Sequence, residues 1–213
     1  MRTIIINSQK GGSAKTMLAK HLSVEAEHAG DGPVFLIDTD PQGSLTAWHT
    51  KRESEAPQRV DLPFEGLEKG LKLLRQHGAS YCIVDTASGR VEVAKELFKF
   101  ADFVIFPVQA SEDDLTAAPV TVHALREAKV PFIFVLTRVK ANTLITAQAA
   151  AVLSKHGQVA ETFVGDRTGY KSPYPKGQTI TEAEPRGNAA KEMAALWTNV
   201  KSCLHESMSV VRG

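Results

Sequence analysis

The chain has 213 residues, 43% of them hydrophobic, so we expect one α/β domain over residues 1–213. Its net charge is +1, so DNA binding would need a local or dimer-assembled basic patch. No apolar run approaches the roughly 20 residues of a membrane span, and the chain begins directly with strand residues rather than a signal peptide. Its two cysteines, Cys82 and Cys203, match no metal or redox pattern, which favours a cytoplasmic protein.

Apolar runs alternate with segments of helical spacing along the chain. The isoleucine run in residues 3–7 is typical of a buried central strand, and we expect further strands over 33–37, 81–84, 103–108, 131–136 and 159–164. We expect helices over 15–29, 64–77, 91–100, 113–127, 143–156 and 188–205, and a short one through Leu45 and Trp48. Pro119 should mark a kink or restart in its helix. Residues 51–59 look like an exposed loop, and residues 165–185 are rich in loop-forming residues.

This alternation predicts βαβ units with right-handed crossovers. The expected fold is α/β, with a mostly parallel twisted sheet flanked by helices on both faces. Ligands of such sheets bind outside the carboxyl ends of the strands, so polar residues that follow strands are the candidate site.

The first of these segments follows the isoleucine strand and reads Gln9-Lys10-Gly11-Gly12-Ser13-Ala14-Lys15-Thr16. A strand, a glycine turn and Lys-Thr at a helix start form the layout of a phosphate-binding loop, whose free backbone amides can surround an anion. Lys15 would contact the β- and γ-phosphates, and the Thr16 hydroxyl would ligate Mg²⁺. The strict pattern has glycine where Gln9 and Ala14 stand, so a glycine turn with two solvated lysines is the alternative.

Two aspartate segments follow later strands. Asp38 opens Asp38-Thr39-Asp40-Pro41-Gln42-Gly43, and Asp85 ends the apolar run Tyr81-Cys82-Ile83-Val84. Asp85 could hold Mg²⁺ directly or through water, and Asp38 could orient the attacking water or the shell of the metal. Each could also cap a helix or shape a turn.

Taken together, Lys-Gly-Gly-x-x-Lys-Thr, Asp-x-Asp-Pro-Gln-Gly and the Asp85 strand end resemble the ParA/MinD family of deviant Walker A ATPases over nearly the whole chain. Phe106-Pro107-Val108-Gln109 with Asp113-Asp114-Leu115, Thr137-Arg138, and Gly177-x-Thr-Ile-x-Glu182 with Ala189-Ala190-Lys191-Glu192 are similar to further family segments. The length resembles the compact plasmid-type ParA proteins.

The resemblance implies an ATP- and Mg²⁺-dependent ATPase that dimerises around two nucleotides and segregates or positions cargo such as plasmids. Its catalytic residues would be Lys10, Lys15 and Asp38, with Lys10 reaching across to the partner subunit's phosphates. It implies nucleotide contacts from Lys10, Gly11, Gly12, Ser13, Ala14, Lys15, Thr16, Met17, Thr137 and Arg138, and metal contacts from Thr16, Asp38 and Asp85.

The family also implies a ParB-like or centromere-binding adaptor, nonspecific DNA binding in the ATP state and nucleoid association. Candidate DNA contacts are Arg167, Lys171, Lys176, Arg186, Lys191 and Lys201, although acidic neighbours make an ordinary solvated face an open alternative. The chain departs from the family at Ala14 and at Thr86-Ala87-Ser88-Gly89-Arg90, where a proline-containing run is common.

Two other functions belong to the same fold class. A MinD-like ATPase would act on a membrane or protein cargo and would need a terminal amphipathic helix, which the tail from His205 to Gly213 does not resemble, so we expect no membrane binding. Relatives of the nitrogenase iron protein would need cluster-bridging cysteines, and dethiobiotin synthetase a small-molecule pocket that the sequence does not identify.

Overall fold

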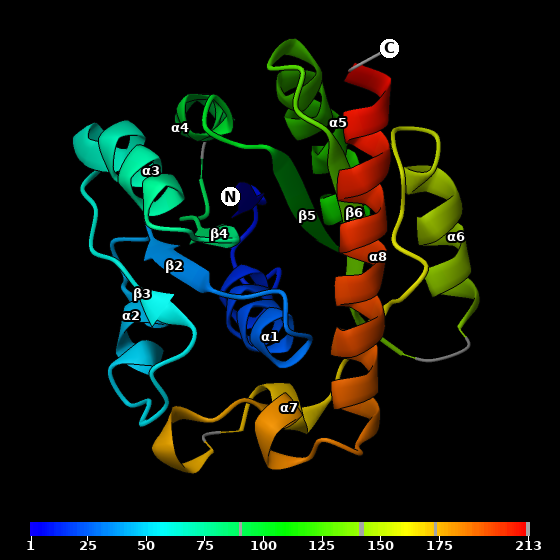
Figure 1. Cartoon of the computed structure of the whole chain (residues 1–213). Coiled ribbons are helices and arrows are strands. Elements are labelled where there is room, and N and C mark those ends of the chain that lie inside the picture. The colour runs from blue at the N-terminus through cyan, green and yellow to red at the C-terminus, as the bar shows by residue number, and fades with distance from the viewer. Residues whose placement is uncertain (90, 141–142, 173, 212–213) are drawn as a thin grey trace.

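A computed structural model describes residues 1–89, 91–140, 143–172 and 174–211 of the chain, and Arg90, Arg212 and Gly213 of the segments discussed above lie outside these ranges. Within the described ranges a seven-stranded parallel sheet has the order β3-β2-β4-β1-β5-β6-β7 (Figure 1). The strands are β1 Arg2–Ile6, β2 Val34–Asp38, β3 Gln58–Arg59, β4 Tyr81–Asp85, β5 Phe103–Gln109, β6 Phe132–Val139 and β7 Val164–Gly165. The predicted fold class is confirmed.

Eight α-helices connect and cover these strands. They are α1 Lys15–His28, α2 Ser44–His49, α3 Leu67–Gln76, α4 Val91–Phe98, α5 Glu112–Glu127, α6 Leu144–Leu153, α7 Ile180–Ala183 and α8 Asn188–Val211, within the described ranges. Short 3₁₀ turns occur at Phe64–Gly66, Thr168–Tyr170 and Pro175–Gly177. Helix α5 continues through Pro119, so no restart of the helix is found there.

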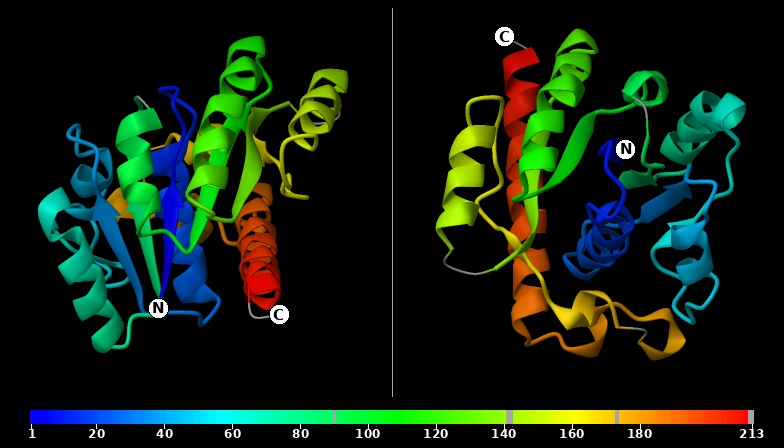
Figure 2. Two further views of the ribbon diagram at one scale, coloured as in Figure 1. Left: turned by 90° about the horizontal axis from the view of Figure 1, so that it is seen from above. Right: turned by 180° about the vertical axis from the view of Figure 1, so that it is seen from behind.

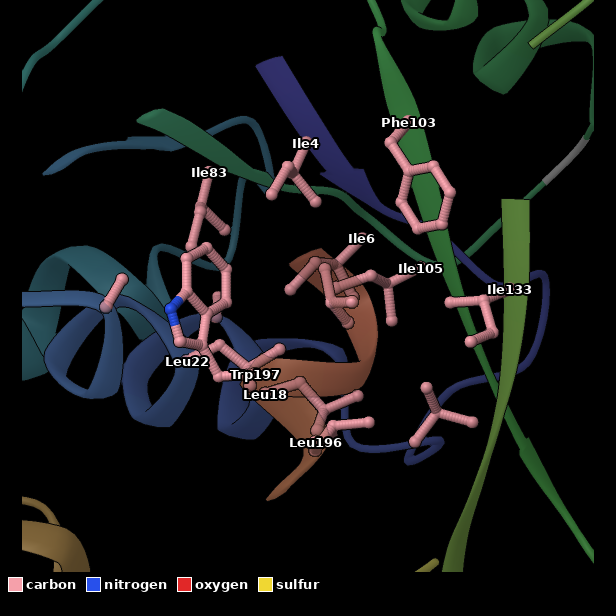
Figure 3. Close-up of a cluster of buried hydrophobic side chains, with 14 of the residues drawn as sticks. Ile4, Ile6, Leu18, Leu22, Ile83, Phe103, Ile105, Ile133, Leu196 and Trp197 are labelled. Atoms are coloured by element: carbon pink, nitrogen blue, oxygen red, sulfur yellow. The ribbon is translucent and has the colours of Figure 1, made fainter. Parts of the chain in front are cut away.

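The two faces of the sheet carry separate cores because side chains alternate along each strand. Ile4 and Ile6 of β1 pack with Leu18 and Leu22 of α1 and with Trp197 of α8 (Figure 3). On the opposite face, Ile5 belongs to the cluster that α3, α4, α5 and α6 cover. Helices therefore lie on both faces, as the views in Figure 2 show.

β1 lies at the centre of the sheet because it pairs with β4 on one side and with β5 on the other. Asp38 and Asp85 stand opposite each other in the pairing of β2 with β4, at the carboxyl ends of both strands. The sheet thus brings the phosphate loop after β1 and both aspartates to one edge, which is where the sequence predicts the site.

Two local predictions were wrong. Residues 159–164 do not form a strand: Val159 makes an isolated bridge to Phe134, and β7 begins only at Val164. The amide of Glu161 bonds instead to the Asn199 side chain of α8, so the chain leaves the sheet edge between these points. The expected loop at 51–59 ends in the short strand β3, and the loop-rich stretch 165–185 also contains the single turn of α7.

Candidate nucleotide site

The loop between β1 and α1 is held in place through its side chains and carbonyl groups. Ser8 Oγ donates to Ser13 Oγ at 2.6 Å, Gln109 Nε2 donates to the Gly12 carbonyl at 3.0 Å, and Thr137 Oγ1 donates to the Ser13 carbonyl at 3.1 Å. Among the described residues, the amides from Gly11 to Ala14 have no hydrogen-bond acceptor. Free amides at the start of a helix form an anion-binding cradle, so the loop is shaped for phosphate before any ligand arrives.

Ala14 is the residue that precedes Lys15 and caps α1. Its φ of 80° and ψ of 21° lie in the left-handed region, which glycine adopts more easily than alanine. The substitution of the family's glycine by Ala14 is therefore a strained one rather than a harmless helical one. Neither the sequence nor the spacing reveals this strain, because it depends on φ.

Lys15 is only 6% exposed and points its ammonium into the mouth of the loop. Its Nζ lies 2.5 Å from Ser88 Oγ and 3.4 Å from the Lys10 carbonyl. Burial lowers the pKa of Lys15, while the negative charges of Asp85 and Asp40 oppose that shift. A buried cation this close to an anion cradle is suited to binding a phosphate group.

Asp85 is fully buried at the end of β4, and burial raises its pKa to about 7. The nearby Asp38 carboxylate raises it further, whereas the Thr16 hydroxyl and Lys15 lower it. Neither carboxylate oxygen has a hydrogen-bond partner in proper geometry among the described residues. Two buried, unpartnered oxygens facing a threonine hydroxyl fit a hard divalent cation such as Mg²⁺, which takes few protein ligands and completes its shell with water and phosphate.

Asp38 is engaged in local structure. Its carboxylate accepts hydrogen bonds from the Thr46 amide at 2.8 Å, the Thr46 hydroxyl at 2.9 Å and the Asp40 amide at 3.1 Å. It therefore anchors the turn before α2 and the first turn of that helix. A carboxylate so placed can reach a water or a metal shell only by exchanging one of these contacts.

Lys10 stands apart from Lys15. Its side chain is 43% exposed, and its Nζ lies 3.1 Å from Asp114 and 3.4 Å from Asp113, at the first turn of α5. These hydrogen bonds raise the pKa of Lys10, which stays a cation at neutral pH. The geometry separates two lysine roles: Lys15 is buried inside the loop, and Lys10 lies outside it.

Thr137 and Arg138, two of the predicted nucleotide contacts, have different surroundings. Thr137 is buried and braces the Ser13 carbonyl. Arg138 is exposed, has a φ of 53°, and places its guanidinium beside Gly12. It lines a small cavity of about 70 Å³ together with Ala14, Met17 and Tyr170. The structure thus brings Arg138 and Met17 to the mouth of the loop and leaves Thr137 behind it.

A larger cavity of about 670 Å³ adjoins this one through Gly165, Asp166 and Arg167. Val139 and Phe163 give it apolar walls, and its size suits the base and sugar of a nucleotide. Sequence reasoning missed this cavity and also missed Ser88 and Gln109. No motif could have revealed the cavity, because its lining comes from four separate stretches of chain.

Four of the six predicted DNA contacts have acidic partners. The ion pairs are Arg167–Glu192, Lys171–Asp166, Lys176–Glu53 and Lys201–Asp31. Arg186 and Lys191 are exposed and form no ion pair with another described residue. The structure therefore does not gather the six side chains into one unpaired basic surface.

The Gly177–Glu182 segment has a structural role in the described chain. Arg52 is buried and bonds to both Glu182 oxygens and to the Gly177 carbonyl, which joins the segment after α2 to α7. Gly177 has a φ of 64°, and a Cβ there would stand 2.7 Å from the Arg52 amide. Glycine is thus required where two chain segments touch.

Two further features of the described residues bear on the expectations from the sequence. Both cysteines are free and buried, and burial raises the pKa of Cys82 to about 12. No helix in the described ranges is long and apolar enough to span a bilayer.

Comparisons with known proteins agree with this geometry. The sequence model of the CobQ/CobB/MinD/ParA nucleotide-binding domain matches residues 4–179. The chain is 30% identical to the maintenance of carboxysome distribution protein A of Gloeobacter kilaueensis, covering 93% of this chain and 92% of that protein. It is 24% identical to the protein ParA of Rhizobium radiobacter, covering 89% and 90%.

Among solved structures, the septum site-determining protein MinD of Pyrococcus horikoshii, complexed with Mg-ADP, has the same fold. Its TM-score is 0.74 at 16% identity, covering 93% of this chain and 95% of that one. With a family match over most of the chain and a preformed phosphate loop, this protein belongs to the CobQ/CobB/MinD/ParA nucleotide-binding family and is a P-loop ATPase.

Proposed function

We propose that this ATPase is a ParA-type positioning switch. ATP binding would join two copies of the chain face to face, and the dimer would bind nonspecific DNA until a ParB-like adaptor stimulates hydrolysis. The relatives named for carboxysome distribution and the relative named ParA both support a positioning role, for a protein cluster or a plasmid.

The observation that carries this proposal is the position of Lys10. Its ammonium lies outside the loop, half exposed, and its partners are two carboxylates of α5. A lysine that served its own subunit's phosphate would gain nothing from this outward position. A lysine that is delivered to a facing subunit would link hydrolysis to dimerisation, because the cation that neutralises developing charge arrives only with the partner.

Each loop residue has a role in this proposal. The amides from Gly11 to Thr16 would cradle the β- and γ-phosphates, and Lys15 would neutralise their charge. Thr16 and Asp85 would hold Mg²⁺, which would neutralise the phosphate oxygens during transfer. Asp38 would orient the attacking water after releasing one of its bonds to Thr46, so hydrolysis would begin with a rearrangement at the start of α2.

DNA binding in three nucleotide states tests the switch. Purified protein should bind random-sequence duplex DNA in ATP with Mg²⁺, and weakly in ADP or without nucleotide. Affinity in the ATP state should fall steeply with salt, as phosphate contacts require. Equal binding in all three states would contradict the switch, and ATP-dependent pelleting with liposomes would favour a MinD-like role instead.

A further inference from the structure

Ser88 reaches the phosphate-binding lysine from the loop that follows β4. Its hydroxyl accepts a hydrogen bond from Lys15 Nζ at 2.5 Å and donates one to the Lys10 carbonyl at 3.3 Å. It also lies 3.9 Å from the position that a Cβ on Gly11 would occupy. Ser88 therefore closes across the phosphate loop and touches both of its ends.

Lys15 has no better partner than Ser88 among the described residues. Its ammonium is buried, forms no ion pair there, and has two acceptors, the Ser88 hydroxyl and the Lys10 carbonyl. A buried ammonium needs acceptors, because the charge loses its hydration when it is buried and only hydrogen bonds or ion pairs compensate for that loss. The Ser88 oxygen thus occupies a position on Lys15 that suits a phosphate oxygen.

We propose that Ser88 is a placeholder for a phosphate oxygen and competes with the nucleotide for Lys15. When phosphate enters the cradle, Lys15 exchanges a neutral hydroxyl for a charged oxygen, and the charge-assisted bond is the stronger of the two. Ser88 then leaves the loop, so occupancy of the phosphate site is coupled to the position of residues 86–89. The inference rests on nucleotide binding at this loop and is independent of DNA, adaptor and cargo.

The coupling has a structural consequence next to the site. Residues 86–89 form one wall of a cavity of about 490 Å³, whose other walls include Asp38, Asp40 and Phe64. Departure of Ser88 from Lys15 would change this wall, on the side of the sheet edge where the Asp38 turn lies. Phosphate occupancy would therefore be signalled to the surface through the segment where this chain departs from the family pattern.

Nucleotide affinity of Ser88 variants tests the proposal. A contact that stabilises only the ligand-free state lowers the apparent affinity for ligand, so removing it should tighten binding. Ser88→Ala should bind ATP about 3- to 10-fold more tightly than the unaltered protein, in line with the loss of one hydrogen bond of typical net strength. Ser88→Asp places a carboxylate on Lys15 and should weaken ATP binding about tenfold or more. Titration calorimetry with ATP and Mg²⁺ measures both.

The controls separate competition from structural damage. Ser88→Thr keeps the hydroxyl and should keep the original affinity. Ser154→Ala removes an exposed serine whose hydroxyl bonds, within the described part of the chain, to the Ala151 carbonyl, and it should change nothing. Weaker or unchanged binding by folded Ser88→Ala, checked by thermal unfolding, would overturn the proposal. Loss of ATP binding by every form, the unaltered protein included, would instead refute the nucleotide site itself.

Discussion

Ala14 holds a left-handed backbone conformation at the first turn of α1, with a φ of 80°. This conformation costs an alanine about 1–2 kcal/mol, and glycine avoids that cost but gives up about 0.5–1 kcal/mol of chain entropy. We therefore expect Ala14→Gly to raise the free energy of unfolding by about 0.5–1 kcal/mol. Urea denaturation without nucleotide measures the change.

The matched control for this substitution is Ala151→Gly. Ala151 is exposed within α6, where the backbone is helical, so glycine should destabilise the protein by about 0.5–1 kcal/mol. Opposite signs at the two positions are the expected result. Destabilisation at both would mean that the left-handed conformation of Ala14 stores no strain.

The buried carboxylate of Asp85 lowers the stability of the folded protein when no ligand is bound. Above its pKa of about 7 the folded protein must hold a buried, unpartnered charge that the unfolded chain exposes to water. We expect Asp85→Asn to stabilise the metal-free protein by about 1–3 kcal/mol at about pH 8. The gain should shrink steadily as the pH falls from about 7 to about 4, because over this range folding must protonate a carboxyl that is still ionised in the unfolded chain. It should be lost only below the ordinary pKa of an aspartate, where both states are protonated.

Denaturation in EDTA at several pH values tests this expectation for Asp85. The same variant should lose Mg²⁺-dependent ATP hydrolysis, because asparagine is a weak ligand for the metal. Equal stability of Asp85→Asn and the unaltered protein across the pH range would contradict this expectation. It would mean that the buried Asp85 carboxylate does not destabilise the folded protein.

Lys10 and Lys15 should separate hydrolysis from binding. Lys10→Ala removes a half-exposed side chain, so ATP affinity should remain while turnover falls at least about tenfold, since a cation supplied to the transition state acts mainly on rate. Lys15→Ala should abolish nucleotide binding. Titration calorimetry and phosphate release measure the two effects, and surviving turnover in Lys10→Ala would refute its delivery to a facing subunit.

At the scale of residues, the sequence predicted which side chains lie near the site, but it did not predict the hydrogen bonds that these side chains form. Lys10, Lys15 and Thr16 share one loop because they are close in sequence. The order of the strands brings Asp38 and Asp85 beside this loop. The hydrogen bond between Lys15 and Ser88 joins residues 73 positions apart, and the bond between Asp38 and Thr46 spans a turn of eight residues. Such contacts follow from the folded loops, which no local pattern encodes.

Arg52 and Glu182 show how two short elements are joined. The Arg52 side chain is 2% exposed, and both its terminal nitrogens bond to Glu182, which also caps α7. Removing one partner of a buried pair leaves an uncompensated charge, so we expect Glu182→Ala to lower stability by about 3–5 kcal/mol. Glu184→Ala, at an exposed position two residues away, should change it by less than about 0.5 kcal/mol.

Urea denaturation of these two variants measures the difference. A loss below about 1 kcal/mol for Glu182→Ala would mean that water replaces the carboxylate at Arg52. The pair of Arg52 and Glu182 matters for function as well. Arg52 follows α2, and Asp38 anchors the start of that helix.

Elements with strong apolar periodicity were predicted, and so was the short helix α2, whereas β3 and α7 were not. β1, β4, β5 and β6 are buried on both faces and read as apolar runs. β3 consists of two polar residues at the sheet edge, and α7 owes its single turn to the pairing of Thr179 with Glu182. β3 therefore depends on its tertiary pairing with β2, whereas α7 is stabilised by a local capping box whose Glu182 also binds Arg52.

At the scale of the whole molecule, four of the six candidate DNA contacts already form ion pairs with carboxylates of the described chain. If the ATP-bound dimer binds DNA, Arg186 and Lys191 should contribute more than residues already paired with carboxylates, because a paired cation must first lose its partner. The double variant Arg186→Ala with Lys191→Ala should reduce the slope of log affinity against log salt by about 2. Lys171→Ala with Lys176→Ala is the matched double variant and should have a smaller effect.

Fluorescence anisotropy in ATP across a salt series measures these slopes. Equal slopes for both double variants would place the DNA contacts elsewhere on the dimer. Net charge alone could not have made this distinction, because a value of +1 hides how the 25 basic and 24 acidic side chains are distributed.

The central position of β1 also sets the order in which the protein can be completed during synthesis. The phosphate loop emerges from the ribosome before the strands that flank β1, which begin at Tyr81 and Phe103, and before α8, which packs on α1. Contacts between residues this far apart in sequence form slowly. Apolar strands that stay exposed before these contacts form are prone to aggregation. A nascent chain stalled before β5 therefore carries every residue of the phosphate loop and still lacks a nucleotide site.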